Sequence, residues 1–347
     1  MKALCKTTGT DGKVRFDLVE RERPPSPGPG DVGIRISHIG ICTSDLHALH
    51  GAMPVPEGNI VGHEFSGIVE EVGAGVVSVK PGDRVVCELA KGACLRCPVC
   101  TGGHYEFCPH KTPPGWASSG IYTEYTVQPE RCLHRLAAAV PLDVAALAEP
   151  LAICAYGCLE RARMRPTERT LIYGMGSIGL CTLIILKDAG FREVVCVTPT
   201  RHGRERLELA TALGADASWA AEDDIPAAVA ARWPGGPDVV VDCSGAAPAI
   251  QQGLTLLPKG GRFVALGITG QPSIAFPFDR ALLRALEVIF SCTSSHSSWQ
   301  HISGVLERRH VEVGRMISLR LPLTRWQEAY QSLEERRAIK AVLVPGV

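Results

Sequence analysis

The chain has 347 residues, more than one ordinary hydrophobic core accommodates, so we expect about two domains. Hydrophobic residues make up 46% and charged residues 21%, as in typical globular proteins. Lys+Arg and Asp+Glu both number 36, so no overall basic field would attract nucleic acid. The start lacks the apolar core of a secretion signal, and no apolar run reaches the roughly 18 to 20 residues of a membrane span. We therefore expect a cytoplasmic protein with neither nucleic-acid nor membrane partners.

The first part of the chain, residues 1–152, is predicted to be a β-rich domain. Short β-branched runs lie at 32–37, 68–72 and 84–87, and turns rich in Gly and Pro separate them. Cysteines gather at about 90–110 in a segment with little apolar content. We expect this segment to form a lobe that has no core of its own.

The pattern changes after this domain, and short apolar runs begin to alternate with helical patterns. The sequence predicts strands and helices in turn at 170–173, 177–189, 194–197 and 205–213, and further strands at 239–243 and 262–266. Such alternation favours βαβ units and a parallel sheet, which we place at 153–290. Residues 291–347, with an amphipathic helix near 326–333 and a strand at 341–344, are expected to return to the first domain. The predicted fold class is α/β.

The cysteine lobe has the spacing C-x2-C-x2-C-x7-C, formed by Cys94, Cys97, Cys100 and Cys108. Four thiolates suit a tetrahedral zinc ion and leave no coordination position for a substrate, so this site is predicted to be structural. Two disulfides or free thiols are the alternative interpretation. A nucleic-acid-binding zinc ribbon is disfavoured because the lobe holds few basic residues.

A second set of metal-binding residue types is spread along the first domain. It comprises Cys42, the adjacent His63 and Glu64, and Glu149 before Pro150. One cysteine, one histidine and a carboxylate, with an open position for water, suit a catalytic zinc. Because these residues are distant in the sequence, spacing alone does not show that they meet. A buried thiol, a core histidine and a carboxylate at a helix start remain the simpler alternatives.

A glycine motif follows the predicted strand at 170–173 and opens the predicted helix at 177–189. It consists of Gly174, Gly176, Ser177, Ile178 and Gly179 around Met175. Between a strand and a helix, G-x-G-x-x-G is typical of dinucleotide binding, because glycines admit the pyrophosphate and helix N-terminal amides face it. Further cofactor contacts are expected at later strand ends, from Ser244, Gly267 and Ile268.

The second strand of this domain bears on the choice of nucleotide. Thr198 stands where NAD-binding sites carry an acidic residue for the ribose hydroxyls. Without that carboxylate a 2′-phosphate is not repelled, and Arg201 or Arg204 can bind it. The sequence therefore favours NADP(H) over NAD(H), although both arginines could instead be solvated charges at a helix start.

Taken in order, G-I-C-T-S-D-L-H at 40–47, G-H-E-F-S-G-I-V at 62–69, the four-cysteine lobe and G-M-G-S-I-G at 174–179 carry a resemblance along the whole chain. They resemble the zinc-containing medium-chain dehydrogenase/reductase (alcohol dehydrogenase) superfamily. Glu149-Pro150-Leu151 is similar to its sorbitol and threonine dehydrogenase branch. The resemblance implies a GroES-like β-rich catalytic domain, a Rossmann cofactor domain with a doubly wound parallel sheet, and two zinc ions per chain.

The resemblance also implies roles for individual residues. Cys42, His63 and Glu64 would bind the catalytic zinc, and Glu149 would be a direct or water-mediated fourth partner. Ser44 would contact the substrate oxygen, and His47 would pass its proton to solvent. Three further roles are implied: Asp45 would orient the ligand histidine, Lys340 would pair with the pyrophosphate, and Trp116 and Tyr122 would line the substrate channel.

The predicted function is hydride transfer between NAD(P) and a secondary alcohol, which gives a ketone. A polyol, sugar, amino sugar or cyclitol is the expected substrate class. Sorbitol itself is disfavoured, because Ser291-Cys292 stands where sorbitol dehydrogenases carry an Arg-Tyr pair. Reduction of an activated aldehyde, imine or enone is one alternative, and a non-enzymatic scaffold is another. A homodimer or homotetramer is expected from the resemblance.

Overall fold

The computed structural model of the chain describes residues 1–346 and divides them into two compact units. The first unit comprises Met1–Glu149 together with Ser294–Val347, and the second comprises Pro150–Thr293. The boundaries expected from the sequence differ from these limits by a few residues at each junction. Among the described residues, no helix is both long and apolar enough to cross a membrane.

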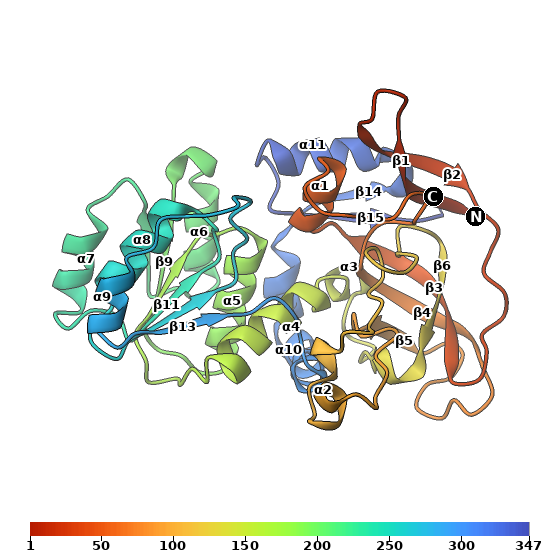
Figure 1. Cartoon of the computed structure of the whole chain (residues 1–347), viewed down its shortest axis with the longest axis horizontal. Helices are drawn as coiled ribbons and strands as arrows, with labels where there is room; N and C mark the ends of the chain where they lie inside the picture. Colours follow the sequence, from red (N-terminus) through yellow and green to blue (C-terminus); the bar gives the residue numbers. More distant parts are fainter. Residues whose placement is uncertain (347) are drawn as a thin grey trace. The chain divides into compact units, whose positions relative to one another are not determined.

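The first unit is built on a seven-stranded sheet in the order β14-β15-β3-β4-β5-β7, with β6 paired to β3, and on a separate β1-β2 hairpin (Figure 1). Its strands are β1 (Lys2–Thr8), β2 (Val14–Glu20), β3 (Asp31–Gly40), β4 (Glu64–Val72), β5 (Arg84–Cys87), β6 (Tyr125–Pro129), β7 (Leu133–Arg135), β14 (Ile317–Pro322) and β15 (Lys340–Val344). In β3 the side chains of Val32, Ile34 and Ile36 are buried while Arg35 is exposed. This alternation is the period-two pattern from which the strand was predicted.

Short helices connect these strands, and the chain returns to the unit at its end. The helices are α1 (Thr43–Leu49), α2 (Pro98–Thr101), η1 (Tyr105–Phe107), η2 (Glu130–Cys132), α3 (Leu142–Ala145), α10 (His296–Gly314), η5 (Leu323–Arg325) and α11 (Trp326–Glu334). β15 pairs antiparallel with β3, so the last strand completes the sheet of the first half of the chain. Helix α11 lies along β14 and β15 (Figure 1).

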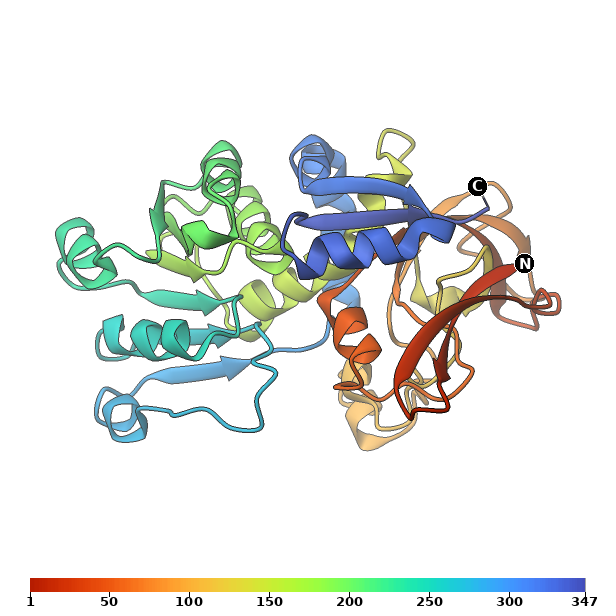
Figure 2. The same cartoon turned by 90° about the horizontal axis from the view of Figure 1, so that it is seen from above.

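The second unit contains a six-stranded parallel sheet in the order β10-β9-β8-β11-β12-β13, which Figure 2 shows side by side. The order corresponds to 3-2-1-4-5-6 of a doubly wound dinucleotide-binding fold. Its strands are β8 (Thr170–Tyr173), β9 (Val194–Thr198), β10 (Ala217–Ala220), β11 (Val239–Asp242), β12 (Arg262–Ala265) and β13 (Glu287–Phe290). Its helices are α4 (Ala148–Ala155, which crosses the junction), η3 (Tyr156–Arg161), α5 (Ser177–Asp188), η4 (Thr200–His202), α6 (Glu205–Ala212), α7 (Ile225–Arg232), α8 (Ala247–Leu256) and α9 (Phe278–Leu283).

The burial of the strands follows their place in this sheet. All residues of β8, β9 and β11 are buried, as expected for central strands covered by helices on both faces. The edge strands β10 and β13 are only partly buried, which explains why their weak apolar patterns were not recognised in the sequence. Helices α7, α8 and α10 were also missed.

Asp238 fixes the start of two neighbouring strands in this sheet. Its Oδ2 accepts hydrogen bonds from the backbone N–H (2.8 Å) and Nε (3.0 Å) of Arg169, and its Oδ1 accepts one from Arg169 Nη2 (2.7 Å). These hydrogen bonds and the arginine charge lower the pKa of Asp238 below its usual value. Folding is therefore favoured by this carboxylate only while it is ionised.

We expect Asp238→Asn to destabilise the protein by about 1 kcal/mol at pH 7, a value typical of a partly exposed ion pair. Because the pKa is lowered on folding, the contribution is complete above the unfolded value and is lost as the pH falls through the folded value. The difference in melting temperature between wild type and variant should therefore shrink below about pH 4. Calorimetry of both proteins from pH 7 to pH 3 measures this difference in melting temperature. The exposed Asp279→Asn is the matched control, and an equal difference at every pH would contradict the prediction.

A candidate zinc site and a dinucleotide-binding edge

The four cysteines of the lobe converge. Their sulfur atoms all lie within 4.8 Å of one another. The Sγ atom of Cys108 lies 4.0 Å from that of Cys97 and 3.7 Å from that of Cys94. A zinc–sulfur distance of about 2.3 Å places tetrahedral thiolates about 3.8 Å apart, so the spacing fits zinc. All fourteen cysteines of the described chain have free thiols, and the structure contains no support for the disulfide alternative.

Backbone amides of the lobe favour the thiolate form of Cys94, whereas burial and the neighbouring cysteines raise the pKa of Cys100 to about 12. The N–H of Cys97 points at Cys94 Sγ, and the N–H of Cys94 points at Cys108 Sγ, both at 3.4 Å. Backbone hydrogen bonds from Arg96 and Cys97 lower the pKa of Cys94 to about 6. Because thiolate is the form that ligates metal, the local backbone is arranged for a bound cation.

Three of the four residues expected at a catalytic zinc also come together. The ligand atoms of Cys42, His63 and Glu64 lie within 4.8 Å of one another. Cys42 is the residue before α1, His63 precedes β4 and Glu64 begins β4, so a helix start and a strand start meet here. Glu149 is not part of this donor group, although it is buried close enough to interact with His63 and Glu64. The structure therefore supplies three donors and a fourth carboxylate nearby.

Asp45 holds two of these donors in position. Its Oδ2 accepts a hydrogen bond from the backbone N–H of Cys42 (3.0 Å), and its Oδ1 lies 3.4 Å from His63 Nδ1. The hydroxyl of Tyr122 donates to the same carboxylate at 2.8 Å. Tyr122 is fully buried, so the expectation that it lines a substrate channel was wrong: it positions Asp45 instead.

Gly62 makes this packing possible. It has a φ of 86°, and a Cβ atom there would lie 2.1 Å from the Tyr122 ring. Only glycine combines that backbone conformation with such a close approach. Gly62 therefore leaves room for the Tyr122 ring. Tyr122 in turn donates to Asp45, the carboxylate that contacts His63.

The charges of the group favour a cation. Burial opposes a charged imidazole, but Asp45 and Cys42 raise the pKa of His63 well above its usual value. Burial, with a contribution from Glu64, raises the pKa of Glu149 to about 7. Three buried carboxylates and one thiol therefore lie around one imidazole and one ammonium group: those of Asp45, Glu64, Glu149, Cys42, His63 and Lys340. The neighbours that raise the pKa of His63, Asp45 and Cys42, would also favour a divalent metal ion at this place.

The ammonium group belongs to Lys340, which is almost fully buried on β15 of the first unit. Its expected contact with the pyrophosphate stays a prediction. Its Nζ lies 2.8 Å from Oε1 and 2.6 Å from Oε2 of Glu64. In this arrangement Lys340 neutralises a candidate zinc ligand.

The residues expected to handle the substrate proton lie on α1. Ser44 and His47 are both half-buried, and their spacing of three residues places them on one face of the helix. The ring of Trp116 lies 5.5 Å from that of His63. Trp116 therefore borders the donor group, in keeping with its expected place near the substrate.

The second unit assembles the expected cofactor residues at one edge of its sheet. Gly174 follows β8, Thr198 ends β9, Ser244 follows β11 and Gly267 follows β12, and all four strands are parallel. Asp242, at the end of β11, accepts hydrogen bonds from the backbone N–H groups of Ser244 (3.0 Å) and Gly245 (3.1 Å). Ligands of such sheets bind outside the carboxyl ends of the strands.

The glycine motif opens α5 as expected. Gly176 precedes the helix, and Ser177, Ile178 and Gly179 form its first turn. A Cβ atom on Gly176 would meet no protein atom within 4 Å. Packing within the protein therefore does not require glycine here, whereas close approach of a pyrophosphate would.

An acidic residue that the sequence analysis missed lies beside the expected 2′-phosphate position. The backbone N–H of Thr200 donates to Glu222 Oε2 at 3.1 Å. That hydrogen bond and, more weakly, the charge of Arg201 lower the pKa of Glu222. Arg201 and Arg204 are both exposed. Glu222 follows β10, a strand whose pattern was too weak to predict.

Comparison with known proteins agrees with this architecture. Residues 28–138 match the alcohol dehydrogenase GroES-like domain, and residues 177–308 match the zinc-binding dehydrogenase domain. The chain is 33% identical to the sorbitol dehydrogenase of Halalkalibacterium halodurans over 347 residues, 99% of each chain. The chain belongs to the zinc-containing alcohol dehydrogenase superfamily. It is an oxidoreductase of the alcohol and polyol dehydrogenase class.

Two solved structures of this family are similar along the whole chain. Alcohol dehydrogenase TADH from Thermus sp. ATN1 has a TM-score of 0.88 and 29% identity, and the match covers 99% of this chain and 100% of that one. A zinc-binding dehydrogenase from Sinorhizobium meliloti 1021 bound to NADP has a TM-score of 0.86 and 28% identity, with 99% of both chains covered. These relatives support zinc and a nicotinamide nucleotide as cofactors.

Proposed function

We propose that the protein oxidises a secondary alcohol of a polyol, sugar, amino sugar or cyclitol to the ketone, and catalyses the reverse reduction. The convergence of Cys42, His63 and Glu64 carries this proposal, because three protein ligands leave a coordination position for substrate. The name of the sorbitol dehydrogenase relative supports a polyol-like substrate. A second zinc ion in the cysteine lobe would be structural.

The proposed chemistry divides between cofactors and side chains. Cys42, His63 and Glu64 would hold the zinc ion, which when bound would lower the pKa of an alcohol, and a bound nicotinamide nucleotide would supply the hydride acceptor. Ser44 receives the alcohol proton, and His47, on the same face of α1, passes it toward solvent. Asp45 keeps His63 and the backbone at Cys42 in place through the contacts described above.

We further propose that NADP(H) is preferred over NAD(H). Thr198 removes the carboxylate that would repel a 2′-phosphate, and the exposed Arg201 and Arg204 supply positive charge after β9. Glu222 opposes this preference, because its charge lies at the backbone of Thr200. The NADP bound to the similar Sinorhizobium structure supports the proposal.

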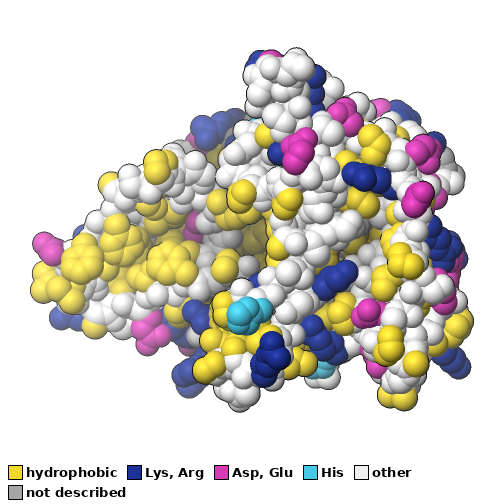
Figure 3. Space-filling model, turned by 45° about the vertical axis from the view of Figure 1, so that its right-hand side comes forward, with side chains coloured by type: hydrophobic (Ala, Val, Ile, Leu, Met, Phe, Trp, Pro, Cys, Tyr) yellow, Lys and Arg dark blue, Asp and Glu magenta, His cyan; other side chains and the backbone are white. Residues whose placement is uncertain are grey.

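A homo-oligomer is also proposed. β13 is an edge strand of its sheet, and Phe278, Leu282, Leu283 and Phe290 expose large apolar side chains on α9 and β13. Figure 3 shows hydrophobic side chains gathered in this part of the surface. An apolar sheet edge favours pairing with a second copy about a two-fold axis. Light scattering of the purified protein would distinguish a monomer from a dimer or tetramer; a cytoplasmic location stays a prediction.

Cys42→Ala should abolish cofactor reduction and lower the zinc content by one ion per chain.

Ser44→Ala should lower kcat by about 10²-fold with the zinc content unchanged, because only the proton acceptor is lost. Ser44→Thr, which keeps the hydroxyl, should retain most activity. Absorbance at 340 nm with a panel of polyols, sugars and aminocyclitols, together with elemental analysis, measures these effects. Turnover that persists in Cys42→Ala would rule out the zinc mechanism.

Arg201→Ala should lower kcat/KM for NADP by about 10- to 100-fold, the effect of losing one charge-assisted hydrogen bond of about 1.5 to 3 kcal/mol. The value for NAD should change little, which makes NAD the internal control. Glu222→Gln should shift the ratio toward NADP, because it removes a negative charge near the 2′-phosphate. A wild-type enzyme that prefers NAD, with the Arg201 variant unaffected, would contradict the assignment.

A further inference from the structure

A third group of metal-binding residue types lies in the first unit, apart from the two zinc sites. Glu88, His134 and His296 bring one ligand atom each to within 4.8 Å of one another. Glu88 Oε1 lies 2.7 Å from His134 Nε2 and 2.6 Å from His296 Nδ1. Two imidazole nitrogens thus converge on one carboxylate oxygen. The sequence predicted no metal-binding role for these residues, because they lie far apart along the chain and in no recognised motif.

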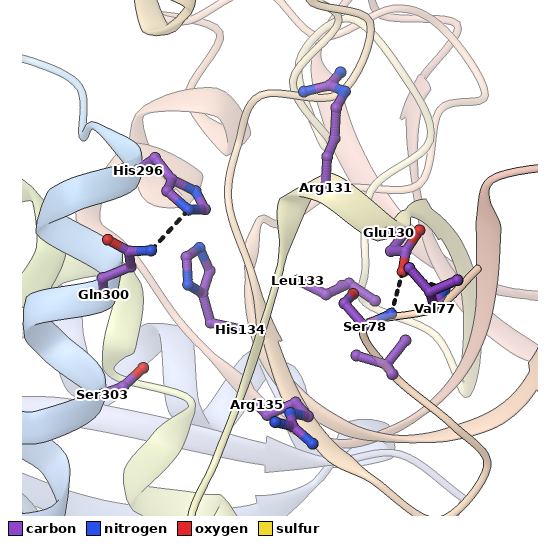
Figure 4. A pocket seen from close by; sticks show the side chains of 11 residues that line it. Val77, Ser78, Glu130, Arg131, Leu133, His134, Arg135, His296, Gln300 and Ser303 are labelled. Atoms are coloured by element: carbon purple, nitrogen blue, oxygen red, sulfur yellow. Dashed lines mark hydrogen bonds between the residues drawn. The ribbon is translucent and has the colours of Figure 1, made fainter. Parts of the chain in front are cut away.

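Three different elements position the group. Glu88 follows β5, His134 lies in β7 and His296 begins α10. His134 is held by stacking on Trp299, with ring centroids 5.7 Å apart and an interplanar angle of 15°. Figure 4 shows the side chains of His134 and His296 pointing toward one another at one side of a pocket of about 720 Å³. Glu88 and His134 are buried, whereas the side chain of His296 is 45% exposed.

The carboxylate is prepared as an anionic ligand. Tyr105 donates its hydroxyl to the other oxygen, Glu88 Oε2, at 2.6 Å. The Oε1 atom is thereby left directed at the two imidazoles. A buried carboxylate with one oxygen held by a hydrogen bond and the other directed at two imidazoles is a suitable metal donor.

The outer nitrogen of His296 also has a partner. The side-chain amide of Gln300 lies 3.1 Å from His296 Nε2 (Figure 4). An amide on the far nitrogen fixes the orientation of a ligand imidazole, whichever of its two atoms faces the ring. The residues around the group therefore hold both ends of the exposed histidine.

We propose that Glu88, His134 and His296 bind a third zinc ion. Two imidazoles and a carboxylate form a donor set that zinc accepts with water in the fourth position, and the pocket beside His296 gives that water access. Zinc–ligand distances of about 2.0 to 2.2 Å require donors roughly 3.3 Å apart, so the group must open by about half an ångström. The exposed His296 side chain can move by that amount, and the buried Glu88–His134 pair, now 2.7 Å apart, must open by a similar amount when the ion binds.

The third ion would join segments that are distant in the sequence. Glu88 is connected through Tyr105 to the cysteine lobe, which has little core of its own. His134 belongs to the sheet, and His296 begins the first helix after the second unit. Zinc at this place would therefore fasten the lobe and the start of α10 to β5 and β7, and its role would be structural rather than catalytic.

The test is the zinc content of the full-length holoenzyme after desalting into metal-free buffer, followed by calorimetric titration with Zn²⁺. Wild type should hold one zinc ion per chain more than His296→Asn. Asparagine separates metal binding from hydrogen bonding, because its side-chain amide can still donate to Glu88 but binds zinc poorly. Ser303 lines the same pocket but is not one of the three donors, so the control variant Ser303→Ala should keep the third ion. His296 lies outside both other zinc sites, so His296→Asn should keep its dehydrogenase activity and its fold.

Cobalt substitution separates the third site from the other two. Co²⁺ bound by Glu88, His134 and His296 has no thiolate ligand, so it should add visible absorption without a thiolate-to-cobalt band, and only when His296 is present. Equal zinc contents in wild type and His296→Asn, together with identical zinc titrations, would overturn the proposal and leave a hydrogen-bonded cluster. Loss of activity in Cys42→Ala with the His296-dependent ion retained would show that the two proposals are independent.

Discussion

The buried ion pair between Glu64 and Lys340 joins the two ends of the first unit's chain at the candidate zinc site. Removing two charges from water costs several kcal/mol per ion, so such a pair contributes little to stability by itself. Losing either partner would nevertheless leave an uncompensated charge among Asp45, Glu64 and Glu149. The zinc donors can therefore be buried only if β15 takes its place beside β3, which makes formation of the site conditional on completion of the sheet.

The need to pair buried charged and polar groups also explains the contacts around His63. Asp45 accepts from the backbone at Cys42 and from Tyr122, and Tyr122 lies against a glycine that no other residue could replace. Each of these groups is neutral or paired only when the others are present. A network of this kind is rigid, and rigid ligands lose less freedom when a metal ion binds. The positions of the candidate donors thus depend on groups that never touch the metal.

Local features were predictable from the sequence. The strand at Thr170–Tyr173 and the helix that follows Gly176 were predicted within one residue, because short apolar runs and glycine punctuation act over a few neighbours. Cys94 to Cys108 also converge as their spacing indicated. Cys42, His63 and Glu64 are different: their residue types suited zinc, but only the resemblance to a family suggested that they meet, because long-range pairing of strands leaves no local signal.

The features that were missed share this long-range character. The ion pair of Lys340 with Glu64 was not predicted, because a positive charge gives no indication of which anion it meets. Glu222 follows a partly buried edge strand whose sequence has no clear period. The hydrogen bond from the backbone N–H of Thr200 to its carboxylate was therefore not predictable from the sequence. Glu88, His134 and His296 are separated by 46 and 162 residues, and their convergence depends on β5, β7 and α10 together.

The interruption of the first unit by the second has a consequence for synthesis. A ribosome delivers residues 1–149 before the 144 residues of the second unit, and residues 294–346 only afterwards. Until then the Ile39–Gly40 end of β3 lacks the strand it pairs with, and Glu64 lacks the positive charge of Lys340. The second unit, continuous in sequence and rich in local βαβ contacts, can fold as soon as it emerges, whereas the first must wait for the return of the chain. Biogenesis of this protein should thus proceed from the inserted unit outward, with metal capture by Cys42, His63 and Glu64 among its final steps.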